Sequence, residues 1–303
     1  MKQRIIIGTR SSRLALWQAE FVLFLINKSF PGITAELKQI KTKGDEITDK
    51  SLVQINGKGL FTKEIENELL EGTIDLAVHS LKDLPTELNP GLRLAAVTKR
   101  HRAEDVLIAK EKNTGIDQLR KNAVIATGSV RRKAQLLYHR QDLKVVDLRG
   151  NVNTRIDKFL KSEWDGIVLA AAGVERLGLE KHISSYIPAD LLLPAVGQGA
   201  LGIEASTANS GIEEILIHLN HRETFIETSA ERAFLKALGG GCKTPIAALA
   251  KLTGKRLSLE GAVCSPDGVS LVRSKAFGPP EYPKELGEKL ANELIMHGAG
   301  KLL

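Results

Sequence analysis

The sequence predicts an α/β protein built from two α/β lobes and a smaller α+β domain at its C-terminal end. Three observations predict this architecture. Short apolar runs alternate with amphipathic helical patterns over the first two thirds of the chain, and this rhythm restarts past residue 100. Beyond about residue 220 the pattern changes to short strands that are flanked by helices. Alternation of strands and helices is typical of βαβ units, in which helices cover the faces of a sheet.

The first lobe opens with an apolar run over 5–7 that Gly8 ends, and Ser11 or Ser12 can cap the helix that follows. The expected elements are, in order, that strand, a helix marked by Leu14, Trp17, Phe21 and Leu25, a strand over 33–41, a helix marked by Phe61, Ile65 and Leu69, and a strand over 74–78. The segment 42–59 is rich in Lys, Asp and Gly and has little periodicity, which predicts either a disordered connection or a lid.

In the second lobe, strands are predicted over 105–109, 123–127, 144–148 and 166–170, with helices over 130–140 and 152–161, and another apolar run follows at 200–205. The C-terminal part is expected to hold a helix that ends at 238–241, strands within 246–276 with a turn at 266–268, and a helix over 282–296. We therefore expect lobe 1 at 1–99 with 200–219, lobe 2 at 100–199, and the α+β domain at 220–303.

Composition places the chain among ordinary soluble proteins. Its 303 residues are 43% apolar, 26% charged and 4% aromatic, which excludes collagen-like, disordered and disulfide-dense chains. Two cysteines cannot form a framework of bridges, so a reduced compartment is expected. No apolar run approaches the ~20 residues of a membrane span. The apolar run at 5–7 is too short to be the apolar core of a signal peptide. These features predict a cytoplasmic protein that does not enter a membrane.

The chain has a formal net charge of +7, which favours anionic partners: nucleic acid, anionic lipid or small acidic substrates. Arginine at the start of a helix opposes the helix dipole, so stability alone would place acidic residues there. A multiply charged anion bound at the carboxyl ends of the strands explains the pattern, and solvated surface arginines remain the alternative. The arginines that follow apolar strands are Arg10 and Arg13, Arg131 and Arg132, Arg149 and Arg155, and Arg176.

The turn that ends the strand at 74–78 carries a candidate catalytic carboxylate. Asp83 lies beside Lys82, and nearby positive charge favours the ionised carboxylate. It can stabilise a developing cation or transfer a proton, although an Asx-type turn before Pro85 would also explain it. We assign no chemistry to His79.

Cys242 follows three glycines, an open approach that suits a covalent attachment or a nucleophile better than core packing. Cys264 is expected to be a small buried residue in a strand. The two cysteines lack clustered ligands at metal spacing, so no zinc site is expected. Gly197-Gln-Gly199 lacks the glycine spacing of a nucleotide-binding loop. The chain also lacks the aromatic residues, spaced among basic ones, on which proteins stack the bases of single-stranded nucleic acids.

Eight segments taken together resemble the porphobilinogen deaminase (hydroxymethylbilane synthase) family, and they follow the family's order over nearly the whole chain. They are GTRSSRLALWQA at 8–19, GKGLFTKEIE at 57–66, DLAVHSLKDLPTE at 75–87, GSVRRKAQL at 128–136, LRGNVNTR at 148–155, LAAAGVERLGL at 169–179, PAVGQGALGIE at 194–204 and ERAFLKALGGGCKTPIAA at 231–248.

The resemblance implies two binding-protein-like lobes and a third domain that carries the cysteine. It implies that Cys242 holds a dipyrromethane cofactor through a thioether, that Asp83 is the catalytic carboxylate, that Lys58 belongs to a lid, and that no metal takes part. Carboxylate groups of cofactor, substrate and growing chain would be bound by Arg10, Ser12, Lys82, Ser129, Arg131, Arg132, Arg149, Arg155 and Arg176. The family reaction joins four porphobilinogen molecules head to tail with loss of ammonia and releases hydroxymethylbilane, used in haem biosynthesis.

Porphobilinogen and the growing oligopyrrole are the expected partners of a monomeric chain. The sequence departs from the usual family pattern at Asn56, Gly128, Lys133 and Gly239, none of which is assigned chemistry. A solute-binding protein for an acidic ligand is one rival class, but it predicts a secretory signal and needs neither Cys242 nor Asp83. A nucleic-acid-binding protein is the other, and it predicts salt-dependent binding to generic DNA or RNA.

Overall fold

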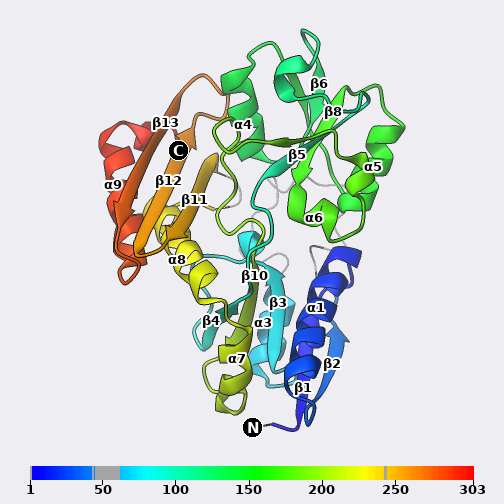
Figure 1. Ribbon diagram of the computed structural model, residues 1–303, viewed down its shortest axis with the longest axis vertical. Coiled ribbons are helices and arrows are strands. Elements are labelled where there is room, and N and C mark those ends of the chain that lie inside the picture. The colour runs from blue at the N-terminus through cyan, green and yellow to red at the C-terminus, as the bar shows by residue number, and fades with distance from the viewer. Residues whose placement is uncertain (1, 43, 45–61, 242–243) are drawn as a thin grey trace. The chain divides into compact units, whose positions relative to one another are not determined.

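The computed structural model describes residues 2–42, 44, 62–241 and 244–303. It confirms the predicted fold class, a mixed α/β protein with two five-stranded sheets and a smaller three-stranded sheet near the C-terminus (Figure 1). The chain divides into two compact units, Met1–Arg100 with Ala200–Phe225 and His101–Gly199 with Ile226–Leu303. Within the described residues, no helix has both the length and the apolar character needed to cross a membrane.

The sheet of the first unit has the strand order β2-β1-β3-β10-β4. Strands β1 and β2 are parallel, β1 and β3 are parallel, and β10 runs antiparallel to both β3 and β4. The strands are β1 (Arg4–Thr9), β2 (Thr34–Gln39), β3 (Leu76–Ser80), β4 (Leu92–Val97) and β10 (Leu201–Ser206), and the helices are α1 (Arg13–Ser29), α3 (Lys63–Leu70) and α7 (Glu213–Leu219).

Two of the apolar clusters in this unit pack helices against the sheet. The buried residues Val22 and Ile26 of α1 and Ile215 of α7 pack with Ile5 and Ile7 of β1. A separate cluster joins the apolar side of α3 to the sheet through Ile65, Leu69, Ile74 and Ala77. The helical spacing of apolar residues predicted α1 and α3, whereas β4 was not predicted. The apolar run at 200–205 forms β10, which enters the sheet antiparallel, so this sheet is mixed rather than purely parallel.

The second unit contains a sheet with the order β7-β6-β8-β5-β9. Strands β6, β7 and β8 are mutually parallel, and β5 is antiparallel to β8 and β9. The strands are β5 (Asp105–Ala109), β6 (Val124–Ala126), β7 (Lys144–Val146), β8 (Gly166–Ala170) and β9 (Ser185–Ile187), and the helices are α4 (Val130–His139), α5 (Val152–Leu160) and α6 (Ala171–Glu175). Leu136 of α4 and Phe159 of α5 are buried in two different clusters of this lobe.

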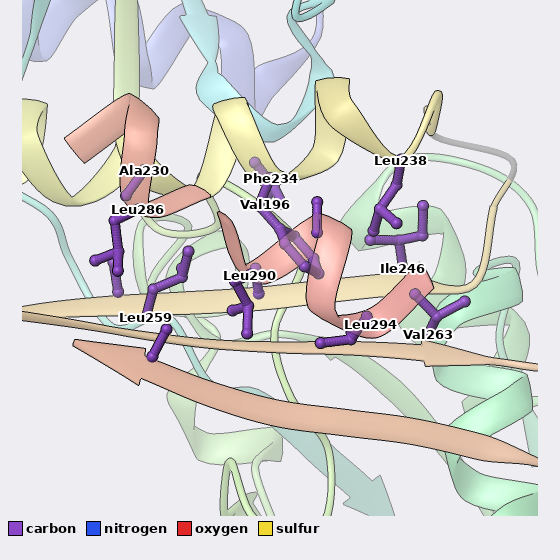
Figure 2. Close-up of a cluster of buried hydrophobic side chains, with 14 of the residues drawn as sticks. Val196, Ala230, Phe234, Leu238, Ile246, Leu259, Val263, Leu286, Leu290 and Leu294 are labelled. Atoms are coloured by element: carbon purple, nitrogen blue, oxygen red, sulfur yellow. The ribbon is translucent and has the colours of Figure 1, made fainter. Parts of the chain in front are cut away.

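The C-terminal part of the second unit is an antiparallel sheet with two helices, as expected. Phe234 of α8 and Leu290 of α9 pack with Leu259 of the sheet in one buried cluster (Figure 2). A Cβ atom on Gly261 would lie 2.5 Å from the Phe234 ring, so glycine permits this approach of helix and strand. The elements are α8 (Arg222–Ala237), β11 (Ile246–Thr253), β12 (Arg256–Cys264), β13 (Leu271–Gly278) and α9 (Pro283–Met296).

Hydrogen bonds and apolar packing join this C-terminal part to residues 193–197. The carboxylate of Glu231, which is fully buried on α8, accepts hydrogen bonds from the backbone N–H groups of Gly197 (2.7 Å) and Ala250 (2.9 Å). The backbone N–H of Ala248 donates to the carbonyl of Pro194 (3.1 Å). Leu193 is buried in one apolar cluster with residues of β11 and β12. The chain just before β10 is therefore held by the C-terminal sheet.

Candidate functional site

In the first unit, predicted site residues gather at one edge of the sheet. The parallel strands β1 and β3 end at the same edge, with Arg10 directly after β1. Ser12 caps α1 and its hydroxyl accepts a hydrogen bond from the backbone N–H of Ala15 (3.3 Å). Lys82 and Asp83 follow β3 in the short 3-10 helix η1 (Leu81–Asp83). The structure thus brings these four predicted residues to one sheet edge.

Asp83 is exposed on an anchored turn. Leu81 and Leu84 on either side of it are buried, at 1% and 4% exposure, and the N–H of Leu81 donates to the carbonyl of Ala200 (3.0 Å). Among the described residues, the Asp83 carboxylate makes no hydrogen bond or ion pair, so it does not form the Asx turn that we considered as the alternative. The turn holds its position through its apolar neighbours and leaves the carboxylate exposed.

In the second unit, the parallel strands β6, β7 and β8 also end at one edge, and every predicted site residue of this lobe follows one of them. Ser129 caps α4 after β6, Arg149 follows β7, and Arg176 follows the short helix α6 after β8. Ligands of open α/β sheets bind at such edges because the loops and helix N-termini that follow the strands converge there. The residues gathered here are Ser129, Arg131, Arg132, Arg149, Arg155 and Arg176.

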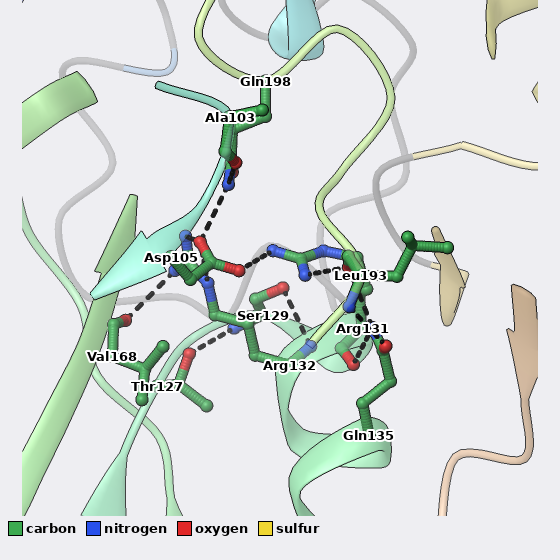
Figure 3. Close-up of polar contacts among 10 residues, drawn as sticks. All are labelled: Ala103, Asp105, Thr127, Ser129, Arg131, Arg132, Gln135, Val168, Leu193 and Gln198. Carbon is green, nitrogen blue, oxygen red and sulfur yellow. Dashed lines mark hydrogen bonds and ion pairs between the residues drawn. The ribbon is translucent and has the colours of Figure 1, made fainter. Parts of the chain in front are cut away.

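Arg131 and Arg132 are buried, which rules out the solvated-surface alternative for these two. Each is 5% exposed, and both bind the carboxylate of Asp105, which is fully buried (Figure 3). The Nη2 of Arg131 donates to Oδ2 of Asp105 (2.8 Å), and the Nη2 of Arg132 donates to Oδ1 (2.7 Å). Arg131 also donates to the carbonyl of Leu193 (2.7 Å) and Arg132 to that of Val168 (3.1 Å).

This cluster carries an excess of positive charge. Burial raises the pKa of Asp105, but the charges of Arg131 and Arg132 outweigh that effect and hold the pKa well below its usual range. The carboxylate is therefore ionised, and two guanidiniums facing one carboxylate leave one net positive charge. Within the described part of the chain, the buried Nε of Arg131 has no hydrogen-bond partner. A buried donor without a partner is costly, so an anion at this edge would be stabilised.

The other three arginines of this edge are partly exposed. The Nε of Arg149 donates to Asp147 (3.0 Å), and the Nε of Arg155 donates to the carbonyl of Gly150 (2.6 Å). The Nη2 of Arg176 donates to the carbonyl of Gly199 (2.7 Å). Burial lowers the pKa of Arg176 to about 10, so this guanidinium stays charged at neutral pH. A bound anion would stabilise that charged form.

Cys242 and Lys58, together with Asn56 and the segment 45–59 of the expected lid, lie outside the described residues. On either side of Cys242, the N–H of Gly241 donates to the hydroxyl of Thr244 (3.0 Å) and the N–H of Thr244 to the carbonyl of Gly241 (3.1 Å). Gly239 has a φ of 65°, a left-handed conformation that glycine adopts without strain.

Two further departures from the family pattern lie near the second sheet edge. Lys133 is exposed on α4. A Cβ atom on Gly128 would lie 2.6 Å from the backbone oxygen of Leu148, so glycine allows the loops after β6 and β7 to approach closely.

Two buried carboxylates, Asp105 and Glu204, lie beside predicted residues and were not predicted from the sequence. Asp105 had a possible signal, since it is a charged residue at the start of an apolar strand. Glu204 of β10 lies 3.1 Å from His79 of β3, and both side chains are buried. This pairing could not be found from sequence because the two strands are far apart in the chain.

Comparison with known proteins identifies the family. Residues 5–214 match the family described as "Porphobilinogen deaminase, dipyromethane cofactor binding domain", and residues 225–296 match "Porphobilinogen deaminase, C-terminal domain". The chain belongs to the porphobilinogen deaminase family. It is 49% identical over 98% of its length to the porphobilinogen deaminase of Syntrophomonas wolfei, of which it covers 97%. It is 46% identical over its full length to that of Pelotomaculum thermopropionicum, again covering 97%.

Among solved structures, the chain also matches the methionine binding protein MetQ, with a TM-score of 0.46, 12% identity and coverage of 74% of this chain and 92% of that chain. The periplasmic VFT2 domain of Bordetella pertussis BvgS has a TM-score of 0.42, 13% identity and coverage of 72% and 86%.

Proposed function

We propose that this chain catalyses its family's reaction with Asp83 as the catalytic carboxylate and Cys242 as the attachment site of the dipyrromethane cofactor. It is a transferase of tetrapyrrole biosynthesis that joins four porphobilinogen molecules head to tail, with loss of one ammonia at each addition, to give hydroxymethylbilane. The observation that supports a binding site for a polyanionic cofactor is the net positive, buried cluster of Arg131, Arg132 and Asp105 at the edge of the second sheet.

The residues of that edge fit a dipyrromethane. Each of its pyrrole rings carries two carboxylates, and the edge offers an excess guanidinium charge and the unpartnered Nε of Arg131. Guanidinium groups bind carboxylates in bidentate fashion, and charge-assisted hydrogen bonds are worth roughly 1.5–3 kcal/mol each. When bound, the dipyrromethane supplies the terminal pyrrole carbon to which the first substrate molecule is joined. Among the described residues, no three or more His, Cys, Asp or Glu side chains gather in a group that could hold a metal ion.

Arg131, Arg132 and Arg155 are proposed to hold the cofactor, because it must be anchored before any substrate arrives. Two of these three already have fixed positions in the core of the lobe. Arg149 and Arg176 are proposed to bind the incoming substrate or the growing chain. Arg10, Ser12, Lys82 and Ser129 are proposed to bind further carboxylates, and Lys58 is proposed to belong to a lid.

Asp83 is proposed to act as an ionised carboxylate on the substrate. Loss of ammonia from porphobilinogen leaves a delocalised pyrrole cation, which a nearby negative charge stabilises. The aminomethyl group of the substrate is an ammonium at neutral pH, so it leaves as ammonia without needing a further proton. The ionised carboxylate can then take up the proton that the attacked ring carbon loses. Its exposure on an anchored turn supports both roles.

The oligomeric state, the localisation and the partners of the chain are part of the same proposal. The chain acts as a monomer in the cytoplasm, binds porphobilinogen and the growing oligopyrrole, and has no nucleic-acid or membrane partner. The division into lobe 1 at 1–99 with 200–219, lobe 2 at 100–199 and a C-terminal domain from 220 stays a prediction.

Intact mass of purified variants tests the site assignment. Cys242→Ser is expected to remove the added mass of two linked pyrroles, and the matched change Cys264→Ser is expected to keep it. Arg131→Leu and Arg132→Leu are expected to leave the protein without cofactor. A Cys242→Ser protein that still carries the two pyrroles would refute the attachment site.

The same spectra separate the two groups of arginines. Arg149→Leu and Arg176→Leu are expected to keep the cofactor and to accumulate species with one or more additional pyrroles, because these variants stall during elongation. If all four arginine variants lack the cofactor, or all four carry it without stalled species, the division between cofactor and substrate arginines is wrong.

A further inference from the structure

One carboxylate holds both of the arginines that we assign to the cofactor. Oδ1 of Asp105 accepts hydrogen bonds from Nε (3.1 Å) and Nη2 (2.7 Å) of Arg132 and from Nε2 of Gln198 (2.9 Å), and Oδ2 accepts from Nη2 of Arg131 (2.8 Å). Asp105 has no solvent exposure, and it begins β5 beside Ala170 at the end of β8. It therefore lies at the edge of the sheet where the predicted ligand-binding residues gather (Figure 3).

The remaining contacts of the two guanidiniums are made with the backbone of the same lobe. Arg131 reaches the carbonyl of Leu193 and Arg132 the carbonyl of Val168, from opposite sides of Asp105. Gln135 in turn accepts from the N–H of Leu193 (2.9 Å) and donates to its carbonyl (3.1 Å). The orientation of both cations is thus determined by the protein itself, without a ligand.

Stability alone is a poor explanation for this arrangement. Desolvation of a buried ion pair offsets much of its Coulombic attraction, so such pairs contribute weakly to folding. Here the arrangement also retains a second guanidinium charge that the single carboxylate does not neutralise, and it leaves the buried Nε of Arg131 without a partner in the described structure. An apolar core would avoid both costs. Preorganised cations, in contrast, lower the cost of binding a carboxylate-rich ligand, because no side chain has to be ordered afterwards.

We infer that Asp105 is a positioning residue for cofactor assembly, which keeps Arg131 and Arg132 oriented in the cofactor-free protein. This inference rests on the proposed function, in which those two arginines hold the dipyrromethane. Asp105 does not contact the cofactor in this scheme. It acts through the two guanidiniums, so its removal affects the rate at which the cofactor is acquired.

The test compares Asp105→Asn with a matched variant, Asp165→Asn. Asp165 also binds an arginine through two hydrogen bonds, from Nε and Nη2 of Arg120 (both 2.8 Å), and it accepts from the backbone N–H of Val124 (2.7 Å). It precedes β8 and contacts the first residue of β6, so it lies at the opposite end of the same sheet. Its loss perturbs the lobe without touching the cluster.

Cofactor-free forms of both variants and of the wild type are incubated with porphobilinogen, well below their unfolding temperatures, and the covalent adduct is followed by intact mass. We expect Asp105→Asn to acquire the cofactor at least about tenfold more slowly than wild type, because the two guanidiniums lose their fixed orientation. Asp165→Asn is expected to acquire it at the wild-type rate. Equal rates for Asp105→Asn and wild type overturn the inference, and so does an equal slowing of both variants, which indicates a general effect of destabilising the lobe.

Asp105→Glu keeps the inference testable if the asparagine variant does not fold. The longer side chain keeps the negative charge but moves the carboxylate, so a folded Asp105→Glu protein is expected to load more slowly than wild type. Wild-type loading by that variant overturns the inference. The proposed function fails separately: Arg131→Leu and Arg132→Leu proteins that load normally refute it, whereas normal loading by the Asp105 variants alone refutes only the positioning role.

Discussion

Replacing Glu231 by glutamine should destabilise the second unit through a single lost acceptor. The two carboxylate oxygens each accept a hydrogen bond from a backbone N–H, one from Gly197 and one from Ala250. Glutamine has only one oxygen, so its NH2 group must face one of these two donors. Glu231 is fully buried, so water cannot readily compensate for the lost acceptor.

The expected cost follows from those two bonds. A buried donor left without a partner costs about 1–3 kcal/mol, and the remaining bond weakens because its acceptor is no longer charged. We expect a loss of about 3 kcal/mol in the free energy of unfolding, which corresponds to a fall in Tm of roughly 6–12 °C for a unit of this size. Glu227→Gln is the matched control. Glu227 lies one turn earlier on α8 and accepts from the N–H of Leu252 (2.9 Å), a bond that the glutamine oxygen can keep.

Urea unfolding followed by tryptophan fluorescence measures this effect. The chain has two tryptophans, and a Trp17→Phe background leaves Trp164 as a reporter of the second unit. The Glu231→Gln midpoint should fall clearly below that of Glu227→Gln, with an unchanged slope. A Glu231→Gln protein within about 0.5 kcal/mol of its background would show that the paired backbone bonds do not stabilise the unit.

Three further changes test the packing, the buried thiol and the candidate catalytic group. Gly287→Ala should destabilise the C-terminal domain by about 1–3 kcal/mol in thermal unfolding, because its Cβ would lie 2.4 Å from a backbone oxygen of α8, whereas Gly300→Ala, which has room, should not. Burial raises the pKa of the Cys264 thiol to about 11 from an ordinary 9.0, so in a Cys242→Ser background it should alkylate at pH 8 about 100-fold more slowly than after unfolding. Equal rates before and after unfolding would contradict its burial. Asp83→Asn should keep its fold and cofactor mass but lose about 100-fold or more in turnover, and retention of half the rate would make Asp83 a turn residue only.

Local pattern predicted most of the elements, because periodicity and capping act between residues a few positions apart. The strands predicted over 105–109 and 166–170 coincide with β5 and β8. The helix predicted over 130–140 is α4, with Ser129 as its cap. The placement of charged residues just past apolar strands predicted which arginines gather at the edge of the second sheet.

The sequence by itself thus determined most of the elements, the sheet edges at which the predicted site residues collect, and the family. Only the tertiary structure decided the partners of the buried charges. Asp105 and Arg131 are separated by 26 residues, and Glu231 meets Gly197 across 34, so no local pattern links them. The antiparallel entry of β10 into the first sheet likewise depends on strands that are distant in the chain. Such pairings are selected by the burial of whole faces and by the need to satisfy every buried polar group, which are properties of the folded chain and not of any short segment.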